Sequence, residues 1–380
     1  MTLEVVRAYS PQTVIERRGS GRAMYLGSTS QHLLAMLGID WPIVQAPMAG
    51  TSTPEMAAAV ANAGGLGSMG VGAMNVKAAE DAIKAFRARS SRSLNINVFC
   101  HRPAQADEAR EAAWLRRLRP EFEAVKGDTP ATLKEIYKSF VVDEPMFTMI
   151  LAAKPKVVSF HFGLPPGEWI RAFREAGIVL LGTATSLREA RACVAAGVQV
   201  LIAQGYEAGG HRGIFDPDEP DDQLGTLALT RLLVRKLEVP VIAAGGIMDG
   251  QGIAAALHLG AGAAQLGTAF VATDESAADG GYRAALFSDA AGHTVMTRAI
   301  SGRPARCLAN RFTALGARVG TGEIPWYPIA YDAGKALNAV AKTAGEAGYG
   351  AHWAGQGAPL ARSLPAGRLV FELVEEFGGR

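Results

Sequence analysis

Short apolar runs alternate with longer amphipathic segments along most of this chain. Eight of the runs are almost continuously apolar, which is typical of strands that are buried on both faces of a sheet. Because each leads toward a helical segment, the pattern favours a parallel TIM-type (β/α)8 barrel, an α/β fold, over an open doubly wound sheet. The predicted strands are Pro42–Pro47, Leu66–Val71, Leu94–Phe99, Val157–Phe162, Val179–Thr185, Val200–Gly205, Pro240–Gly246 and Ala263–Thr268.

Helix-start signals follow several of these runs. A Thr-Ser-Thr sequence precedes a helix predicted at Pro54–Ala63, and Asn75 is the expected N-cap of a helix at Val76–Ala88. The sequence Ser-Leu-Arg-Glu opens a helix at Ser186–Ala196 and matches a capping box, while Gly197 is placed to end that helix. These helices connect successive strands, as a barrel requires.

Two segments interrupt the alternation. Residues 102–149 read as a charged helical insertion after the third strand, and residues 287–380 as helices and loops with several aromatic side chains. Both follow strands at the end of the barrel where active sites lie, so we expect an added helical substrate or lid subdomain over that face. The barrel then takes residues 38–101 and 150–286, and residues 1–37 form an N-terminal arm.

Composition narrows the function classes. The chain has 380 residues and a net charge of +2, so nothing favours a nucleic-acid or membrane partner. Its three cysteines are scattered, without disulfide or zinc spacing, and the first twenty residues lack a secretory pattern. We therefore expect a cytoplasmic protein without a metal site, either a monomer or a homodimer.

The ends of the seventh and eighth strands carry the clearest chemical signal. Gly245 and Gly246 precede a helix that begins near Asp249, and Gln265, Leu266, Gly267 and Thr268 close the next strand. Glycines let backbone N–H groups approach a ligand, and helix N-termini favour anions. Phosphate sites in such barrels recur at these two strand ends, so a phosphate-bearing ligand is predicted.

Other strand ends indicate the rest of that ligand. Asn97 and Gln204 are amides near the ends of apolar strands, able to bind the edge of a planar heterocycle or to bond a neighbouring loop. Pro47 and Met48 end the first strand, where an apolar backbone would lie against a ring. Together they fit flavin mononucleotide (FMN) better than a sugar phosphate.

Two histidines are candidates for acid–base chemistry. His161 ends the fourth strand in SFHFGLP, and His211 follows Gly209 and Gly210 in EAGGHRG. The two glycines would let the backbone pass close to a cofactor and project the His211 ring over it. A neutral imidazole there takes a proton from a carbon acid. These arguments make the two histidines nearly equal candidates for the base.

A further cluster has the spacing of one helix face. Tyr327, Tyr331 and Lys335 recur every four residues in IPWYPIAYDAGKAL. Two phenols and an ammonium suit a small anion such as a carboxylate, since phenols donate hydrogen bonds to anionic oxygens. The alternative is an ordinary amphipathic helix with the rings packed inward and the lysine solvated.

Taken in order, the motifs QAPMAG, NVF, SFHFGLP, AQGYEAGGHRG, AAGGI and QLGT resemble the nitronate monooxygenases, particularly class I, formerly called 2-nitropropane dioxygenases. The resemblance covers nearly the whole chain after about residue 38. It implies an FMN-bearing barrel with a helical substrate domain, in which His211 is the catalytic base and His161 lines the substrate pocket. Family FMN contacts match Asn97, Gln204, Gly209, Gly246 and Gln265–Thr268, and substrate-side residues match Tyr137, Tyr282, Tyr327, Tyr331 and Lys335.

The implied reaction is oxidation of an alkyl nitronate by FMN with molecular oxygen as co-substrate. Propionate 3-nitronate, a metabolic poison, is the typical class I substrate, so the implied role is detoxification. Two alternatives stay open: an FMN-dependent NAD(P)H reductase of a quinone or enoyl thioester on the same barrel, and a flavin- or phosphate-binding protein without turnover.

Overall fold

The structure is a computed structural model that describes residues 13–15 and 24–378. Of the predicted N-terminal arm, residues 1–12 and 16–23 lie outside the described residues. Two short strands, β1 (Thr13–Ile15) and β2 (Met24–Leu26), pair antiparallel. Helix α1 (Ser28–Leu37) follows, and its Leu33 and Leu37 are buried in the same cluster as the first barrel strand. This part of the predicted arm thus belongs to the barrel core.

Eight parallel strands form the central sheet, which confirms the predicted barrel. Neighbouring strands pair in the order β3-β11-β10-β8-β7-β6-β5-β4. A parallel bridge between Val44 and Leu66 joins the two ends of this order and closes the barrel. The strands are β3 (Ile43–Gln45), β4 (Gly67–Gly70), β5 (Leu94–Phe99), β6 (Val157–His161), β7 (Val179–Ala184), β8 (Val200–Gln204), β10 (Val241–Ala244) and β11 (Ala263–Leu266).

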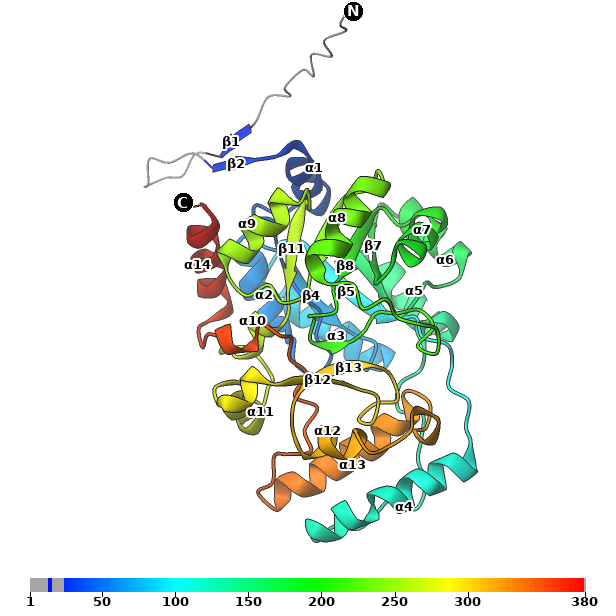
Figure 1. Cartoon of the computed structure of the whole chain (residues 1–380). Coiled ribbons are helices and arrows are strands. Elements are labelled where there is room, and N and C mark those ends of the chain that lie inside the picture. The colour runs from blue at the N-terminus through cyan, green and yellow to red at the C-terminus, as the bar shows by residue number, and fades with distance from the viewer. Residues whose placement is uncertain (1–12, 16–23, 379–380) are drawn as a thin grey trace, which may run out of the picture.

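Helices cover the outside of the sheet, as Figure 1 shows. The C-terminal helix α14 (Ala366–Gly378) packs against α2 and α9. Its Leu369 and Leu373 lie in the barrel core, although α14 was predicted to belong to the helical subdomain. Helix α5 (Glu144–Ala153) also packs on the barrel and spans the predicted boundary at residues 149 and 150. The others are α2 (Pro54–Asn62), α3 (Val76–Arg87), α6 (Gly167–Glu175), α7 (Leu187–Ala196), α8 (Thr226–Lys236), α9 (Gly250–His258) and α10 (Thr268–Val271).

Local capping explains where several of these helices begin. The side chains of Thr53, Asn75 and Ser186 each accept a hydrogen bond from a backbone N–H in the first turn of α2, α3 and α7. The capping box predicted at α7 is incomplete. Its Glu189 carboxylate accepts from the N–H and the hydroxyl of Thr185, both at 2.7 Å, instead of from the N-cap residue. Glu189 therefore fixes the end of β7 as well as the helix.

A second layer covers the carboxyl ends of the barrel strands. Helix α4 (Glu108–Ala124), from the insertion, packs against α13 (Ile329–Thr343), from the C-terminal region, on the side of the barrel away from α1 (Figure 1). A three-stranded antiparallel sheet in the order β12-β13-β9 lies between them and the barrel, made of β12 (Thr294–Thr297), β13 (Ala305–Leu308) and β9 (Gly210–His211). The sequence did not predict this sheet. Short helices complete the layer: α11 (Gly280–Leu286), α12 (Arg311–Gly316), and the 3-10 turns η1 (Phe140–Val142), η2 (Asp289–Gly292), η3 (Thr321–Glu323) and η4 (Ala358–Leu360).

Within the described residues, no helix combines the length and the apolar character needed to cross a bilayer.

Candidate functional site

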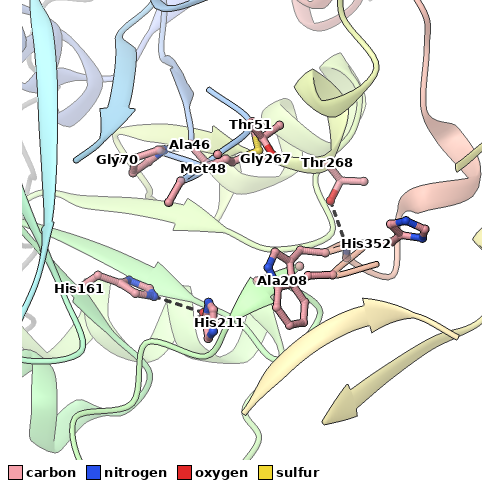
Figure 2. A pocket seen from close by; sticks show the side chains of 18 of the residues that line it. Ala46, Met48, Thr51, Gly70, His161, Ala208, His211, Gly267, Thr268 and His352 are labelled. Carbon is pink, nitrogen blue, oxygen red and sulfur yellow. Dashed lines mark hydrogen bonds between the residues drawn. The ribbon is translucent and has the colours of Figure 1, made fainter. Parts of the chain in front are cut away.

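A cavity of about 520 Å³ lies between the carboxyl ends of the barrel strands and the second layer. Its wall combines strand ends, the turn that carries His211, residues from α13, and the 350–357 segment. Figure 2 shows His161 and His211 on one side, with Gly267 and Thr268 across from them. The volume lies within the range of about 300–1,000 Å³ that is typical of small-molecule and cofactor sites.

The ends of β10 and β11 form a glycine cradle at one side of the cavity. Gly245 and Gly246 both have positive φ, 123° and 71°. A Cβ at Gly245 would come within 3.1 Å of the Ala208 backbone nitrogen, so a side chain there would intrude on the turn before His211. Nearby, the buried Oε1 of Gln265 has no hydrogen-bond partner within the described residues. This wall offers exposed backbone and an unsatisfied amide to a polar ligand.

The other predicted cofactor contacts lie at the same cavity, with one exception. Pro47, Met48, Gly209, Gly210, Gly267 and Thr268 all line it. Leu266 does not, because its side chain is buried in the barrel core. The absence of a side chain at Gly209 is required by the chain itself, since a Cβ would lie 2.4 Å from the Gly355 nitrogen. The lack of a side chain at Gly209 therefore lets the backbone of residues 354–355 pack against it.

The two strand-end amides bind neighbouring backbone. Gln204 donates through Nε2 to the His211 carbonyl at 2.9 Å, and its Oε1 accepts from the Gly213 N–H at 2.6 Å. Asn97 donates through Nδ2 to the carbonyl and the hydroxyl of Ser159, at 3.1 and 2.9 Å. Both residues line the cavity. Gln204 therefore acts on the turn that carries His211, as the loop-bonding alternative predicted.

His211 is held by a strand and by a hydroxyl. Its backbone pairs with Ala305 of β13, and its Nε2 lies 2.8 Å from the Ser301 hydroxyl oxygen. Ser301 donates its own proton to the Arg303 carbonyl at 3.2 Å, so it accepts from Nε2–H. The Nδ1 atom makes no hydrogen bond within the described part of the chain. A neutral His211 in this arrangement keeps a free lone pair on Nδ1.

His161 has no such free lone pair. Its Nε2 lies 3.2 Å from the His211 carbonyl, which can only accept, so Nε2 carries the proton. Its Nδ1 then accepts from the Thr183 hydroxyl, also at 3.2 Å. Both ring nitrogens are occupied. The hydrogen bonds thus separate two histidines that the sequence left level, and they favour His211 as the base.

The surroundings of these histidines keep both uncharged at neutral pH. Burial lowers the pKa of His211 to about 3, and the neighbouring His161, Arg303 and His101 contribute further. Burial likewise lowers the pKa of His161 to about 4, with Arg303 adding to the shift. An imidazole that stays neutral keeps its lone pair available for a proton.

A third buried histidine gives a prediction for stability. Burial, followed by the charge of Arg303, lowers the pKa of His101 to about 3, below the value near 6.5 expected in an unfolded chain. Between those pH values the unfolded state binds the extra proton, so stability is lost as the pH falls below about 6.5. We expect His101→Phe, which keeps the ring contacts with Tyr327 and Phe162, to flatten the decline in melting temperature between pH 7 and 5. Parallel curves for variant and wild type would contradict this account.

The side of the cavity next to α13 is aromatic and carries one ammonium group. Lys335 Nζ lies 4.9 Å from the ring centre of Tyr137 and 5.4 Å from that of Tyr331, and forms no ion pair within the described residues. The buried Tyr327 hydroxyl likewise has no partner there. Only Tyr331 and Lys335 lie on α13, since Tyr327 precedes Pro328, its N-cap. Of the three residues predicted to share one helix face, Tyr331 and Lys335 therefore lie on α13 and Tyr327 lies outside it.

Tyr282 lies at the cavity with its hydroxyl engaged. It donates to the Trp353 carbonyl, and its ring stacks on His352 with the centres 5.0 Å apart. Tyr282 therefore fixes the segment that brings Trp353 against His211, with 5.1 Å between those ring centres.

Several lining residues were not predicted from the sequence: Thr183, Asn338, His352 and Trp353. Asn338 continues the α13 face of Tyr331 and Lys335 at helical spacing, so periodicity was the signal that would have found it. Trp353 comes from an irregular segment that no periodicity marks. Among the described residues, no three His, Cys, Asp or Glu side chains are grouped so as to hold a metal ion.

Comparison with known proteins gives consistent results. A sequence model of the nitronate monooxygenase family matches residues 30–376. A nitronate monooxygenase of Paraburkholderia phytofirmans is 62% identical over 344 residues, which are 90% of this chain and 94% of that protein. One from Pseudomonas aeruginosa is 50% identical over 90% of this chain and 98% of its own.

Two solved structures superpose on most of this chain. Nitroalkane oxidase from Streptomyces ansochromogenes superposes with a TM-score of 0.83 at 41% identity, over 91% of this chain and 97% of that one. FabK from Thermotoga maritima superposes with a TM-score of 0.68 at 29% identity, over 91% and 95% of the two chains.

Proposed function

The chain belongs to the nitronate monooxygenase family, and from that premise we propose that it oxidises alkyl nitronates with FMN and molecular oxygen, acting on propionate 3-nitronate. The observation that carries the proposal is one cavity with His211 at one wall, Lys335 at another and the glycine cradle at a third. A base, an anion-binding cation and a phosphate-type cradle are the parts this chemistry requires.

The residues present fit FMN. The cradle of Gly245, Gly246 and Gly267 offers backbone N–H groups to a phosphate, next to the start of α10 at Thr268. The unsatisfied Oε1 of Gln265 can accept a hydrogen bond from such a ligand. Pro47 and Met48 provide an apolar surface for a ring. When bound, FMN would supply the electron acceptor for the substrate and the reaction with oxygen.

On the substrate side, Lys335 and the phenols bind and orient. Propionate 3-nitronate has a carboxylate at one end and a nitronate at the other. Lys335, beside Tyr137 and Tyr331, holds the carboxylate, because an unpaired ammonium flanked by aromatic faces gains a charge-assisted hydrogen bond there. Tyr327, with its free hydroxyl, lies between this group and His211 and donates to an anionic oxygen.

His211 acts at the carbon end. Its free Nδ1 removes the proton from a neutral nitroalkane, while Ser301 accepts from Nε2–H and fixes the tautomer. A nitronate already lacks that proton, so with it His211 serves mainly in binding. His161, with both nitrogens occupied, positions the His211 backbone.

Anaerobic mixing tests the proposal. We expect propionate 3-nitronate to bleach the flavin absorbance of the FMN-loaded protein and NADH to leave it unchanged. The FMN-dependent NAD(P)H reductase that the sequence motifs left open is the second candidate. Bleaching by NADH alone would establish that candidate, and bleaching by neither would favour a binding protein without turnover.

A further inference from the structure

Arg303 is a buried cation without an acidic partner. Arg303 is only 4% exposed, and it forms no ion pair within the described residues. One guanidinium nitrogen, Nη2, donates to the backbone carbonyls of Ile214 and Phe215, while Nε has no partner among the described residues. Burial lowers the pKa of Arg303 to about 10, which still leaves it charged at neutral pH.

This charge lies directly behind the His211 side of the cavity. The guanidinium carbon of Arg303 is 4.4 Å from the ring centre of Phe162. Phe162 in turn meets His211 and Tyr327 edge-on, with ring centres 5.6 and 5.5 Å away, and His101 at 6.3 Å. A single aromatic ring therefore separates the cation from the reacting side of the cavity.

We propose that Arg303 is a specificity-determining residue, whose buried, unpaired charge favours an anionic substrate in the cavity. Arg303 does not line the cavity, so it acts by its field and not by contact. The inference rests on the proposed function for the identity of the anion, a nitronate. Arg303 also contributes, less than burial does, to the lowered pKa of His101, His161 and His211, and this contribution is independent of that function.

Few other charges face His211. The titratable groups around it are His161 at the end of β6, His101 after β5, Arg303 before β13, Tyr327 just before α13 and Tyr331 in the first turn of α13. The phenols are neutral, because burial raises the pKa of both. Arg303 is therefore the one charged group of this set.

The nearest carboxylates are engaged elsewhere. Asp216 pairs with Arg102 at 3.1 Å, and Asp218 pairs with Arg298 at 2.8 Å. Both acids act on Arg303 only at longer range. In a low-dielectric interior such a charge is weakly screened, so an anion entering the cavity gains from it.

A neighbouring arginine provides a matched control. Arg306, on β13, is also buried, at 3% exposure, and bonds the Tyr206 carbonyl through Nε and Nη2. Arg306 does not contribute to the lowered pKa of His101, His161 or His211. Removing its charge tests the general cost of losing a buried arginine.

The experiment compares Arg303→Met, Arg303→Lys and Arg306→Met as FMN-loaded proteins. We expect Arg303→Met to weaken binding of inorganic nitrite, followed by flavin absorbance, by about tenfold, and to lower the nitronate-to-nitroalkane ratio of kcat/KM similarly. Arg303→Lys should recover much of both, and Arg306→Met should change neither by more than about twofold. In ¹³C-histidine NMR spectra, Arg303→Met should raise the pKa of at least one buried histidine.

The outcomes separate the inference from the proposed function. Equal effects of Arg303→Met and Arg306→Met, or unchanged nitrite affinity and histidine titration in Arg303→Met, would overturn the role of Arg303. If Arg303→Met does not fold, Arg303→Gln keeps a donor for the carbonyls of Ile214 and Phe215 and decides the same question. A wild type that fails to oxidise nitronates would overturn the proposed function, while nitrite binding and histidine titration would still test Arg303.

Discussion

Replacing His211 with asparagine will reduce turnover of a neutral nitroalkane by about a hundredfold or more, while the protein keeps its fold and its cofactor. Loss of a general base costs about 10²–10⁴ in rate. Asparagine is smaller than histidine, and the β9–β13 pairing that holds this position is made by backbone groups, so it should survive. It has no basic lone pair to replace Nδ1.

The choice of substrate makes this prediction sharper. A preformed nitronate no longer carries the proton that a base removes, so its turnover should fall much less than that of the nitroalkane. Steady-state oxygen consumption with nitroethane and with ethyl nitronate gives the two ratios. Flavin absorbance of the purified variant checks that the cofactor is retained.

His161→Asn is the comparison variant. Both nitrogens of His161 are occupied, by the Thr183 hydroxyl and the His211 carbonyl, so its loss should disturb position more than proton transfer. We expect a smaller fall in nitroalkane turnover than in His211→Asn. If His211→Asn turns over both substrates at the wild-type rate and His161→Asn does not, the base is His161.

The barrel was predictable because its strands are buried on both faces. The run Leu94–Phe99 is apolar apart from two asparagines, and the structure has a strand over those residues. Where the predicted and observed strands differ, as at Pro240–Gly246 against Val241–Ala244, the glycine pair leaves the sheet with positive φ. Continuous burial gives a strong sequence signal, and glycine marks its end.

The small sheet that carries His211 was not predictable in the same way. Strand β9 has two residues, Gly210 and His211, and its partner Ala305 lies far along the chain. A pairing of that length leaves no periodicity in the sequence, and its position depends on tertiary contacts such as the Arg212 N–H donated to the Pro304 carbonyl at 2.8 Å. The sequence therefore located His211 at the site without the contacts that decide its tautomer.

Side-chain partners were the least predictable feature. Gln204 and Asn97 line the cavity, and their amides bond the backbone of His211 and Ser159. A strand-end amide can satisfy a loop or a ligand equally well, and only the fold brings the competing carbonyl within reach. Ser301 gave no sequence signal, because its role follows from the turn before β13.

Replacing Lys335 with methionine will weaken binding of propionate 3-nitronate by about 10- to 100-fold in KM, while a nitronate without a carboxylate is little affected. A hydrogen bond between charged groups contributes about 1.5–3 kcal/mol, which corresponds to that range. Methionine keeps the length and apolar stem of the side chain, while the cation–π contacts of the ammonium with Tyr137 and Tyr331 are lost in both substrate assays alike. Burial lowers the pKa of Lys335, while the nearby Asp332 opposes that shift.

The measurement compares two substrates and two lysines. Propyl 1-nitronate has the same carbon chain as propionate 3-nitronate without the carboxylate, and its KM should change by less than about threefold. Lys342→Met is the control on the same helix, since Lys342 is exposed and pairs with Asp279 at 2.5 Å. Equal weakening of both substrates in Lys335→Met would mean that Lys335 supports the fold of α13 and does not bind the carboxylate. A selective loss confined to the carboxylated substrate would identify Lys335 as the group that recognises it.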